Sequence, residues 1–423
     1  MSSSSRPLGG RFLFVVAVIA GGAPCAVFAQ GDFHITFGTT GDPEHRNADT
    51  ATIVVEAENG DLIVAGSGAS FWSDTGHNHT NPMVARIDSH GELQWQRVYD
   101  DLENHRITAF ASRGEAQYMV LEPTIAPERL FLDGLVRPVT LRQIDERGKV
   151  SEVLGTLEGF WVLQVIPVVD RELSHFLIVG KKGTTNREAI AADVQLFHLD
   201  LQGRVTEMSS PAGVNRIEHL QHIGGQEFLF SQWHHGPDHV VDALRLTDAH
   251  TDIVRLDRTG ETEIVRSIAD ALCRPLVASR DRIFCAEAPS LRTDQTNDAI
   301  VAYSAAGQEL WRHDLERGMH VEQMHLLGSG ELIYSYHEIA NTIVSRLSPS
   351  GGLLWRQTLR SAGQYTFLTA IESLKSGRLA FLGSTGPWHG FVSTDTNAML
   401  LVTDASASDL NAPEILSNII DLL

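Results

Sequence analysis

The stretch Asn81–Tyr99 reads NPMVARIDSHGELQWQRVY, and its pattern decides the fold. The first half alternates apolar and polar residues up to Asp88, as a half-buried strand does. Asp-x-x-Gly follows as a tight turn, with Gly91 at the position where the backbone needs a positive φ angle. A second alternating run starts near Trp95. The stretch therefore predicts a β-hairpin.

The turn of this hairpin recurs along the chain at intervals of roughly 44 to 57 residues. The last residues of the successive copies are Gly91, Gly148, Gly203, Gly260, Gly307, Gly351 and Ala407. Seven copies at this period suit a β-propeller in which each repeat packs only on its neighbours. The predicted fold class is all-β, a seven-bladed β-propeller of four-stranded antiparallel blades.

The first copy contains all four strands that a blade needs. They are TATIVVEAE (50–58), LIVAGSG (62–68), MVARID (83–88) and ELQWQRVY (92–99). The seventh copy has a third strand, AMLLVTD (398–404), but no convincing fourth strand after its turn. Phe33–Phe37 near the N-terminus fits that role, so we expect it to complete the last blade and close the ring.

Parts of the chain resemble two known families of short repeats. DFHITFGTTGD (32–42), with ENGDLIVAGS and MVARID after it, is similar to the delta-60 repeat of bacterial secreted proteins. VAYSAAGQELWRHDL (301–315) resembles a pyrroloquinoline-quinone-type propeller repeat, with its tryptophan on the outer strand. The resemblance implies a propeller. It implies little about activity, because the cofactor and calcium ligands of the quinoprotein enzymes have no match here, and vicinal cysteines are absent.

The two ends of the chain differ from the repeats. Arg6 and Arg11 precede a short apolar run, and small residues lie just before Gln30, so residues 1–29 are expected to be a secretory signal peptide. The alternative is a membrane anchor, for which the run is short. Residues 30–410 then form the propeller. Residues 411–423 are expected to form an amphipathic helix that docks on the propeller or binds a partner or membrane.

The net charge and the cysteine content limit the possible partners and the cellular compartment of the protein. The net charge of −20 argues against nucleic acid or an anionic membrane surface as the main partner. No apolar run in the mature chain is long enough for a transmembrane helix. Cys273 and Cys285 remain after the signal, and a hairpin centred near Ser279 would place them opposite each other. We expect a cross-strand disulfide in an oxidising compartment, the alternative being two buried thiols.

The longest connections should lie on one face, because loops between the second and third strands share a face with those between blades. Three of these loops carry a tryptophan together with histidines, and an exposed indole there can stack on a sugar or anchor a protein. The predicted ligand-binding tryptophans are Trp72, Trp233 and Trp388. The alternative is that they fold over the blades. Trp95, Trp311 and Trp355 lie four residues after a turn glycine and are expected to be packing residues.

Two histidine clusters in these loops can supply ligands to a divalent metal. The candidate ligands are His77, His79, His234, His235 and His239. Neither spacing is diagnostic of zinc, and solvated loop histidines are the alternative, so no cofactor is expected beyond a possible divalent metal.

A third set of candidates lies where each blade connection enters the innermost strand, near the channel mouth. Its members are His45, Arg46, His105, Arg106 and Arg216. Several arginines there can bind a carboxylate or sulfate, because the guanidinium fork matches such anions. The alternative is salt bridging to the nearby Glu44, Glu103 and Asp49.

These features predict a monomeric, secreted or periplasmic propeller that acts as a binding scaffold for a protein or carbohydrate on the loop-rich face. The alternative is a metal-assisted lyase or hydrolase of an acidic polysaccharide, with an arginine for the uronate carboxylate and a His or Tyr as base. The sequence holds no serine nucleophile elbow, phosphate loop, metalloprotease helix or paired-cysteine zinc motif. That absence from the sequence favours the scaffold.

Overall fold

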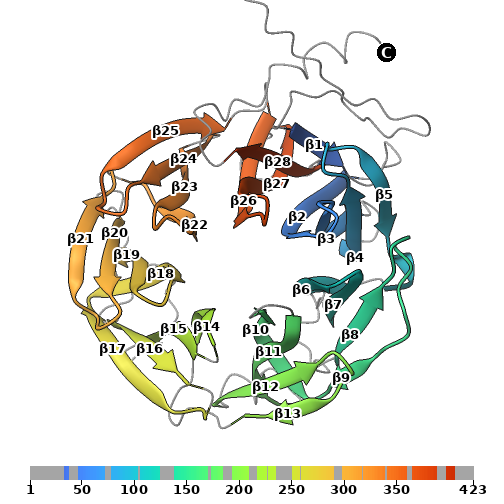
Figure 1. Ribbon diagram of the computed structural model, residues 1–423, viewed down its shortest axis with the longest axis horizontal. Helices are drawn as coiled ribbons and strands as arrows, with labels where there is room; N and C mark the ends of the chain where they lie inside the picture. The colour runs from blue at the N-terminus through green and yellow to red at the C-terminus, as the bar shows by residue number, and fades with distance from the viewer. Residues whose placement is uncertain are drawn as a thin grey trace, which may run out of the picture.

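The computed structural model is a ring of seven four-stranded antiparallel sheets around a central opening (Figure 1). This confirms the predicted seven-bladed β-propeller. The residues that the structure describes are 33–37, 46–71, 78–102, 105–123, 138–169, 173–183, 193–208, 217–225, 227–234, 250–257, 259–289, 298–316, 318–338, 341–359, 364–387 and 397–404. Within them the only helical element is the 3-10 turn η1 (Asp100–Leu102). The predicted signal peptide (1–29) and C-terminal helix (411–423) lie outside these residues.

Each blade runs outward from the channel through four strands. The innermost strands are β2 (Arg46–Glu56), β6 (His105–Arg113), β10 (Phe160–Val169), β14 (Glu218–Gly224), β18 (Ala271–Ala278), β22 (Val321–Leu326) and β26 (Gln364–Ser373). The second strands are β3 (Leu62–Phe71), β7 (Ala116–Pro123), β11 (Leu173–Lys182), β15 (Glu227–His234), β19 (Arg282–Pro289), β23 (Leu332–Glu338) and β27 (Arg378–Pro387).

The third strands are β4 (Asn78–Ile87), β8 (Val139–Ile144), β12 (Val194–Asp200), β16 (His250–Leu256), β20 (Ala299–Ser304), β24 (Asn341–Leu347) and β28 (Asn397–Asp404). The outermost strands are β5 (Leu93–Val98), β9 (Gly155–Leu157), β13 (Val205–Glu207), β17 (Thr262–Ala269), β21 (Glu309–Asp314), β25 (Leu353–Leu359) and β1 (Phe33–Phe37).

The N-terminal strand closes the ring. β1 pairs antiparallel with β28, so that Phe33 lies opposite Val402 and Phe37 opposite Ala398. The last blade therefore has the strand order β1-β28-β27-β26, with one strand from the start of the chain and three from its end. This confirms the predicted closure, and it ties the two ends of the ring together.

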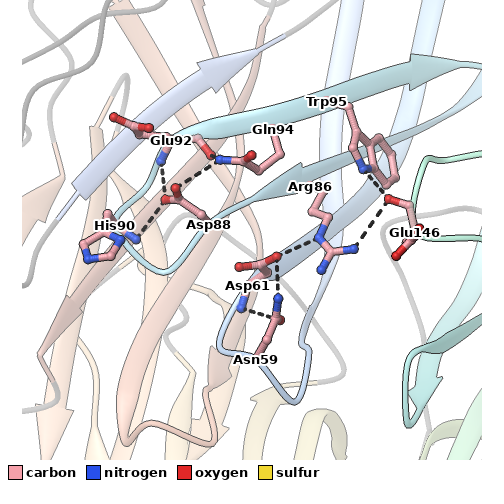
Figure 2. Close-up of polar contacts among 9 residues, drawn as sticks. All are labelled: Asn59, Asp61, Arg86, Asp88, His90, Glu92, Gln94, Trp95 and Glu146. Carbon is pink, nitrogen blue, oxygen red and sulfur yellow. Dashed lines mark hydrogen bonds and ion pairs between the residues drawn. The ribbon is translucent and has the colours of Figure 1, made fainter.

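The recurring turn is stabilised by its first residue. The Asp88 Oδ1 atom accepts hydrogen bonds from the backbone N–H groups of His90, at 2.9 Å, and Glu92, at 2.8 Å (Figure 2). Gly91 follows with a φ of 89°. The same two bonds recur in the later turns at Asp145, Asp200 and Asp257, while serine hydroxyls accept one such bond at Ser304 and Ser348. The side chain at this position thus holds the hairpin closed.

Two of the turns also contact an outer-strand tryptophan of the preceding blade. The Trp95 indole N–H donates to the Glu146 carbonyl in the next turn at 2.8 Å, and Arg86 donates to the same oxygen (Figure 2). Trp311 repeats the contact with the Pro349 carbonyl at 3.0 Å. Glycine is required beside these rings, because a Cβ atom on Gly351 would lie 2.7 Å from the Trp311 ring. Trp95 and Trp311 therefore connect neighbouring blades, and Trp355 packs against the apolar cluster between the sixth and seventh blades, in agreement with their predicted packing role.

Apolar clusters fill the space between neighbouring blades. Val64 and Met83 of the first blade, for example, pack against Leu382 and Leu400 of the last. Comparable clusters lie at the other blade junctions. The core is thus distributed around the ring, and the innermost strands are left to line the channel.

The predicted disulfide joins Cys273 of β18 to Cys285 of β19, with a Cα–Cα distance of 5.4 Å. The register differs from the expected one. Cys285 pairs with Leu276, and Cys273 pairs with Glu287 on the far side of an irregularity between Cys273 and Leu276. The two cysteines are therefore diagonal neighbours across the hairpin and not directly opposite each other, and the bulge brings them within bonding reach.

Candidate functional site in the central channel

Three of the predicted channel-mouth residues begin innermost strands. Arg46 begins β2, and His105 and Arg106 begin β6. Arg106 is paired within its own blade, since its guanidinium donates to the Glu122 carboxylate from Nη2 at 2.8 Å and from Nε at 3.1 Å. Burial raises the pKa of Glu122, and the Arg106 charge offsets part of this effect. The ion-pair partner thus differs from the acidic residues expected near it in sequence.

The imidazole of His105 is held by the backbone. Its Nδ1 atom lies 3.1 Å from the Leu102 carbonyl oxygen at the end of η1. The side chain of Arg46, and the whole of His45 and Arg216, lie outside the described residues. The proposed anion site at the channel mouth therefore remains a prediction.

Trp233 lies in a different place from the one expected. It belongs to strand β15, paired with Thr251, and only 6% of its surface is exposed. The Arg274 guanidinium lies 5.4 Å from the ring centroid, and Leu272 packs on the indole. Its assignment to an exposed loop is wrong, because β15 extends to His234 and Trp233 pairs with Thr251 of β16. Trp72 and Trp388 lie outside the described residues.

The predicted metal ligands are not described as side chains. His79 and His234 are placed only by their backbones in β4 and β15, and His77, His235 and His239 lie outside the described residues. In the ranges that the structure does describe, no three His, Cys, Asp or Glu side chains are grouped as a metal site. The possible divalent metal therefore stays a prediction.

A cavity of about 320 Å³ is lined by residues of the innermost strands β14, β18, β22 and β26. These strands border the central opening of the ring (Figure 1). Each of these strands carries a β-bulge before it reaches the cavity. A bulge redirects the side chains that follow it. Gln221 and Gln323, the first paired residues after the bulges of β14 and β22, line the cavity together with His325 and Glu372. Four polar side chains from three blades therefore meet in one small volume.

The wall of the cavity is held rigidly by hydrogen bonds between blades. Gln221 Nε2 donates to the Leu276 carbonyl at 2.8 Å, and its Oε1 accepts from the Ala278 N–H at 2.8 Å. His325 Nε2 lies 2.7 Å from Ser373 Oγ, which joins β22 to β26. Burial lowers the pKa of His325 to about 4, so its imidazole is neutral at physiological pH.

Glu372 has the most perturbed carboxyl in the cavity. Its side chain is exposed to solvent, but partial desolvation by the surrounding protein raises its pKa to about 7. No described residue donates a hydrogen bond or forms an ion pair with it. A carboxyl with neither a cation nor a hydrogen-bond donor beside it is poised to take a proton or a positively charged group.

A second arrangement lies at the other end of β22. The Asp298 carboxylate is fully buried and accepts the Val321 N–H at 3.0 Å. Its other oxygen lies 2.9 Å from His320 Nδ1, and His320 remains partly exposed. A buried carboxylate that orients an imidazole in this way can support proton transfer at the outer nitrogen.

The alternation of the innermost strands gave little sign of this cavity. His325 and Glu372 each lie in a short run of mixed apolar and polar residues that is typical of a half-buried strand. The available signal was an ionisable residue within an innermost strand, at the third paired position after the bulge in both β22 and β26.

No protein-family model and no curated protein matches the chain. Solved structures do match its fold. The β-propeller domain of the Trilobed protease from Pyrococcus furiosus is 10% identical with a TM-score of 0.52, over 86% of this chain and 99% of that one. Prolyl oligopeptidase B from Galerina marginata is 10% identical with a TM-score of 0.52, over 81% of this chain and 49% of that one. An acylaminoacyl peptidase is 10% identical with a TM-score of 0.51, over 84% and 51%.

These likenesses show the propeller fold alone, because the identities are low. The chain spans about half the length of the two peptidases. Within the described ranges, no helix is both long and apolar enough to cross a membrane.

Proposed function

We propose that this protein is a ligand-binding β-propeller and that the cavity in its central channel holds the ligand. The observation that carries the proposal is the 320 Å³ volume lined by Gln221, Gln323, His325 and Glu372. A volume of this size is at the lower end of the range for small-ligand sites, and it suits one small molecule or one side chain of a partner. Gln221 and His325 are preorganised by hydrogen bonds between blades, which lowers the cost of ordering them on binding.

The disulfide between Cys273 and Cys285 suggests an oxidising compartment. With the signal-peptide pattern of residues 1–29, this supports a secreted or periplasmic location. The likeness to delta-60 and quinone-type repeats supports a place among secreted propeller proteins, without a quinone cofactor. A protein or carbohydrate partner on the loop-rich face fits the same proposal, because long loops on a rigid ring commonly carry recognition.

The proposal is tested by blocking the cavity. The chain from Gln30 onward is screened for small molecules and peptides that raise its melting temperature, and the hits are repeated with Ala278→Phe. Ala278 lines the cavity, so a phenyl group there fills part of it. We expect hits that stabilise the wild type and not the variant.

A second blocking variant, Gln323→Phe, protects the test against a failure to fold, and an unchanged melting temperature without ligand is the control for each variant. Hits that stabilise the wild type and both folded variants equally would place binding outside the channel and contradict the proposal.

A second function is favoured by Asp298 and His320. Their geometry supplies a base at the channel mouth, as an acidic-polysaccharide lyase requires. The test is the release of unsaturated products from polyuronates, measured by ultraviolet absorbance. Activity that His320→Gln removes would favour this function, and absence of turnover by the wild type would contradict it.

A further inference from the structure

The Glu372 carboxyl is the unusual group in the cavity, because nothing in the described structure compensates its charge. Its neighbours on the same wall are the amide of Gln323, the neutral imidazole of His325 and the apolar side chains of Met324 and Ile371. The Glu372 side chain is exposed to water, and no described cation or hydrogen-bond donor lies beside its carboxylate. The site therefore gains most from a ligand that brings a positive charge and hydrogen-bond donors.

The neighbouring charges do not fill this role. Glu56 of β2 accepts the Ser376 N–H at 2.9 Å, and it would repel an anion. Lys375 follows β26 in the turn, and Arg378 begins β27. None of these residues forms a hydrogen bond or ion pair with Glu372 in the part of the chain that is described. Burial alone accounts for its raised pKa.

We propose that the channel cavity binds a compact organic cation, a guanidinium group in preference to an ammonium group, with its charge against the Glu372 carboxylate. This inference rests on the proposed function, because it assigns the ligand class of the same cavity. Guanidinium suits the site because its planar fork forms two parallel hydrogen bonds with a carboxylate and is more weakly hydrated than ammonium. The net charge of −20 also draws cations toward the protein.

The proposal has a defined pH dependence. The cation binds the ionised carboxylate, so binding competes with the proton that Glu372 holds below about pH 7. Affinity rises as the pH increases toward 7 and is constant above it. His325 stays neutral throughout this range, because its pKa is about 4, and it adds no opposing charge.

The test is calorimetric titration of the chain from Gln30 onward with ethylguanidinium chloride. Below about pH 7, we expect the affinity to fall by roughly tenfold per pH unit. Glu372→Gln keeps the size of the side chain and removes its charge, and it should weaken binding by at least about tenfold and abolish the pH dependence. Glu115→Gln, in the turn between β6 and β7, is the matched control and should bind as the wild type does.

The outcomes separate the two proposals. Loss of binding in both Glu372→Gln and Ala278→Phe supports the cation site. Loss of binding in Ala278→Phe with unchanged affinity in Glu372→Gln contradicts the cation site but still supports ligand binding in the cavity. Binding that neither variant affects shows that ethylguanidinium binds outside the cavity, and it contradicts both proposals for this ligand. If the wild type does not bind ethylguanidinium at about pH 8.5, the proposal of a cation site is contradicted. The thermal-shift screen then still tests whether the cavity binds another ligand.

A comparison with peptides distinguishes a free small cation from an arginine side chain of a protein partner as the source of the guanidinium. The blocked peptide acetyl-Gly-Arg-Gly-amide is compared with ethylguanidinium, and acetyl-Gly-citrulline-Gly-amide is its neutral isostere. Tighter binding of the arginine peptide, lost in Glu372→Gln, assigns the site to a side chain of a protein partner. Weaker binding of the peptide assigns it to a free small cation. Equal binding of the citrulline peptide contradicts recognition of charge.

Discussion

At the scale of single residues, one position in each turn does most to define the repeat. Asp145 accepts the Lys149 and Arg147 N–H groups, at 2.8 and 2.9 Å. The bond from Lys149 is the main cause that lowers the pKa of Asp145. Asp200 and Asp257 have lowered pKa values as well. Ser304 and Ser348 accept one of these bonds with an uncharged hydroxyl. Either a carboxylate or a hydroxyl can therefore accept a backbone N–H at this position of the turn.

Asp145→Ala should lower the melting temperature by a few degrees at neutral pH, because two backbone donors lose their acceptor. The pKa of Asp145 is lower in the folded state than in the unfolded state, so its stabilisation is complete above the unfolded value. It is lost as the pH falls through the folded value. The difference between variant and wild type should therefore shrink below about pH 4 in thermal melts. Asp145→Ser is the control, and a loss equal to that of alanine would contradict the role assigned to the acceptor.

At the scale of elements, the turn of one blade fits under the outer-strand tryptophan of the blade before it. Trp311 donates to Pro349 at 3.0 Å, and Gly351 lies against its ring with a φ of 87°. The glycine thus serves both the backbone conformation and the contact between blades. Gly377, in the hairpin turn between β26 and β27, has a φ of 82°, and a Cβ atom there would meet no described heavy atom within 4 Å.

Gly351→Ala and Gly377→Ala form a matched pair. Both place alanine in a left-handed conformation, which costs about 1–2 kcal/mol. Only Gly351→Ala adds a clash with Trp311. Chemical denaturation should show a larger loss of unfolding free energy for Gly351→Ala. Equal losses would mean that the turn makes no tight contact with the neighbouring blade.

At the scale of the whole molecule, the ring depends on one short strand from the other end of the chain. β1 extends β28, and Ile35 packs on the cluster shared by the first and last blades. Each other blade draws its strands from one continuous segment. Closure is therefore the step that turns a linear row of repeats into a ring.

Deletion of residues 30–37 should lower the unfolding free energy by at least about 2 kcal/mol, because the hydrogen bonds of β28 and the burial of Ile35 are lost. Deletion of residues 30–32 alone is the control and should have little effect. Equal stability of the two deletion variants, measured by denaturant titration, would show that β1 does not latch the ring.

The same scale explains what the sequence could and could not predict. The turn at Asp88 and its copies located every blade, because the pattern is local. The register of the β18–β19 hairpin and the burial of Trp233 are seen only in the folded ring, where Cys285 lies opposite Leu276 and Trp233 is 6% exposed. Glu372 could not be recognised from its own strand, because the cavity around it forms only when several blades come together.

The most direct test of the channel site is a pH titration of the Glu372 side-chain carboxyl carbon by NMR, with and without saturating ethylguanidinium. We predict a pKa of about 7 in the free protein and a clear decrease when the cation is bound. An ordinary glutamate pKa in the free protein, unchanged by the cation, would contradict the proposal that this carboxylate is the binding group of the channel.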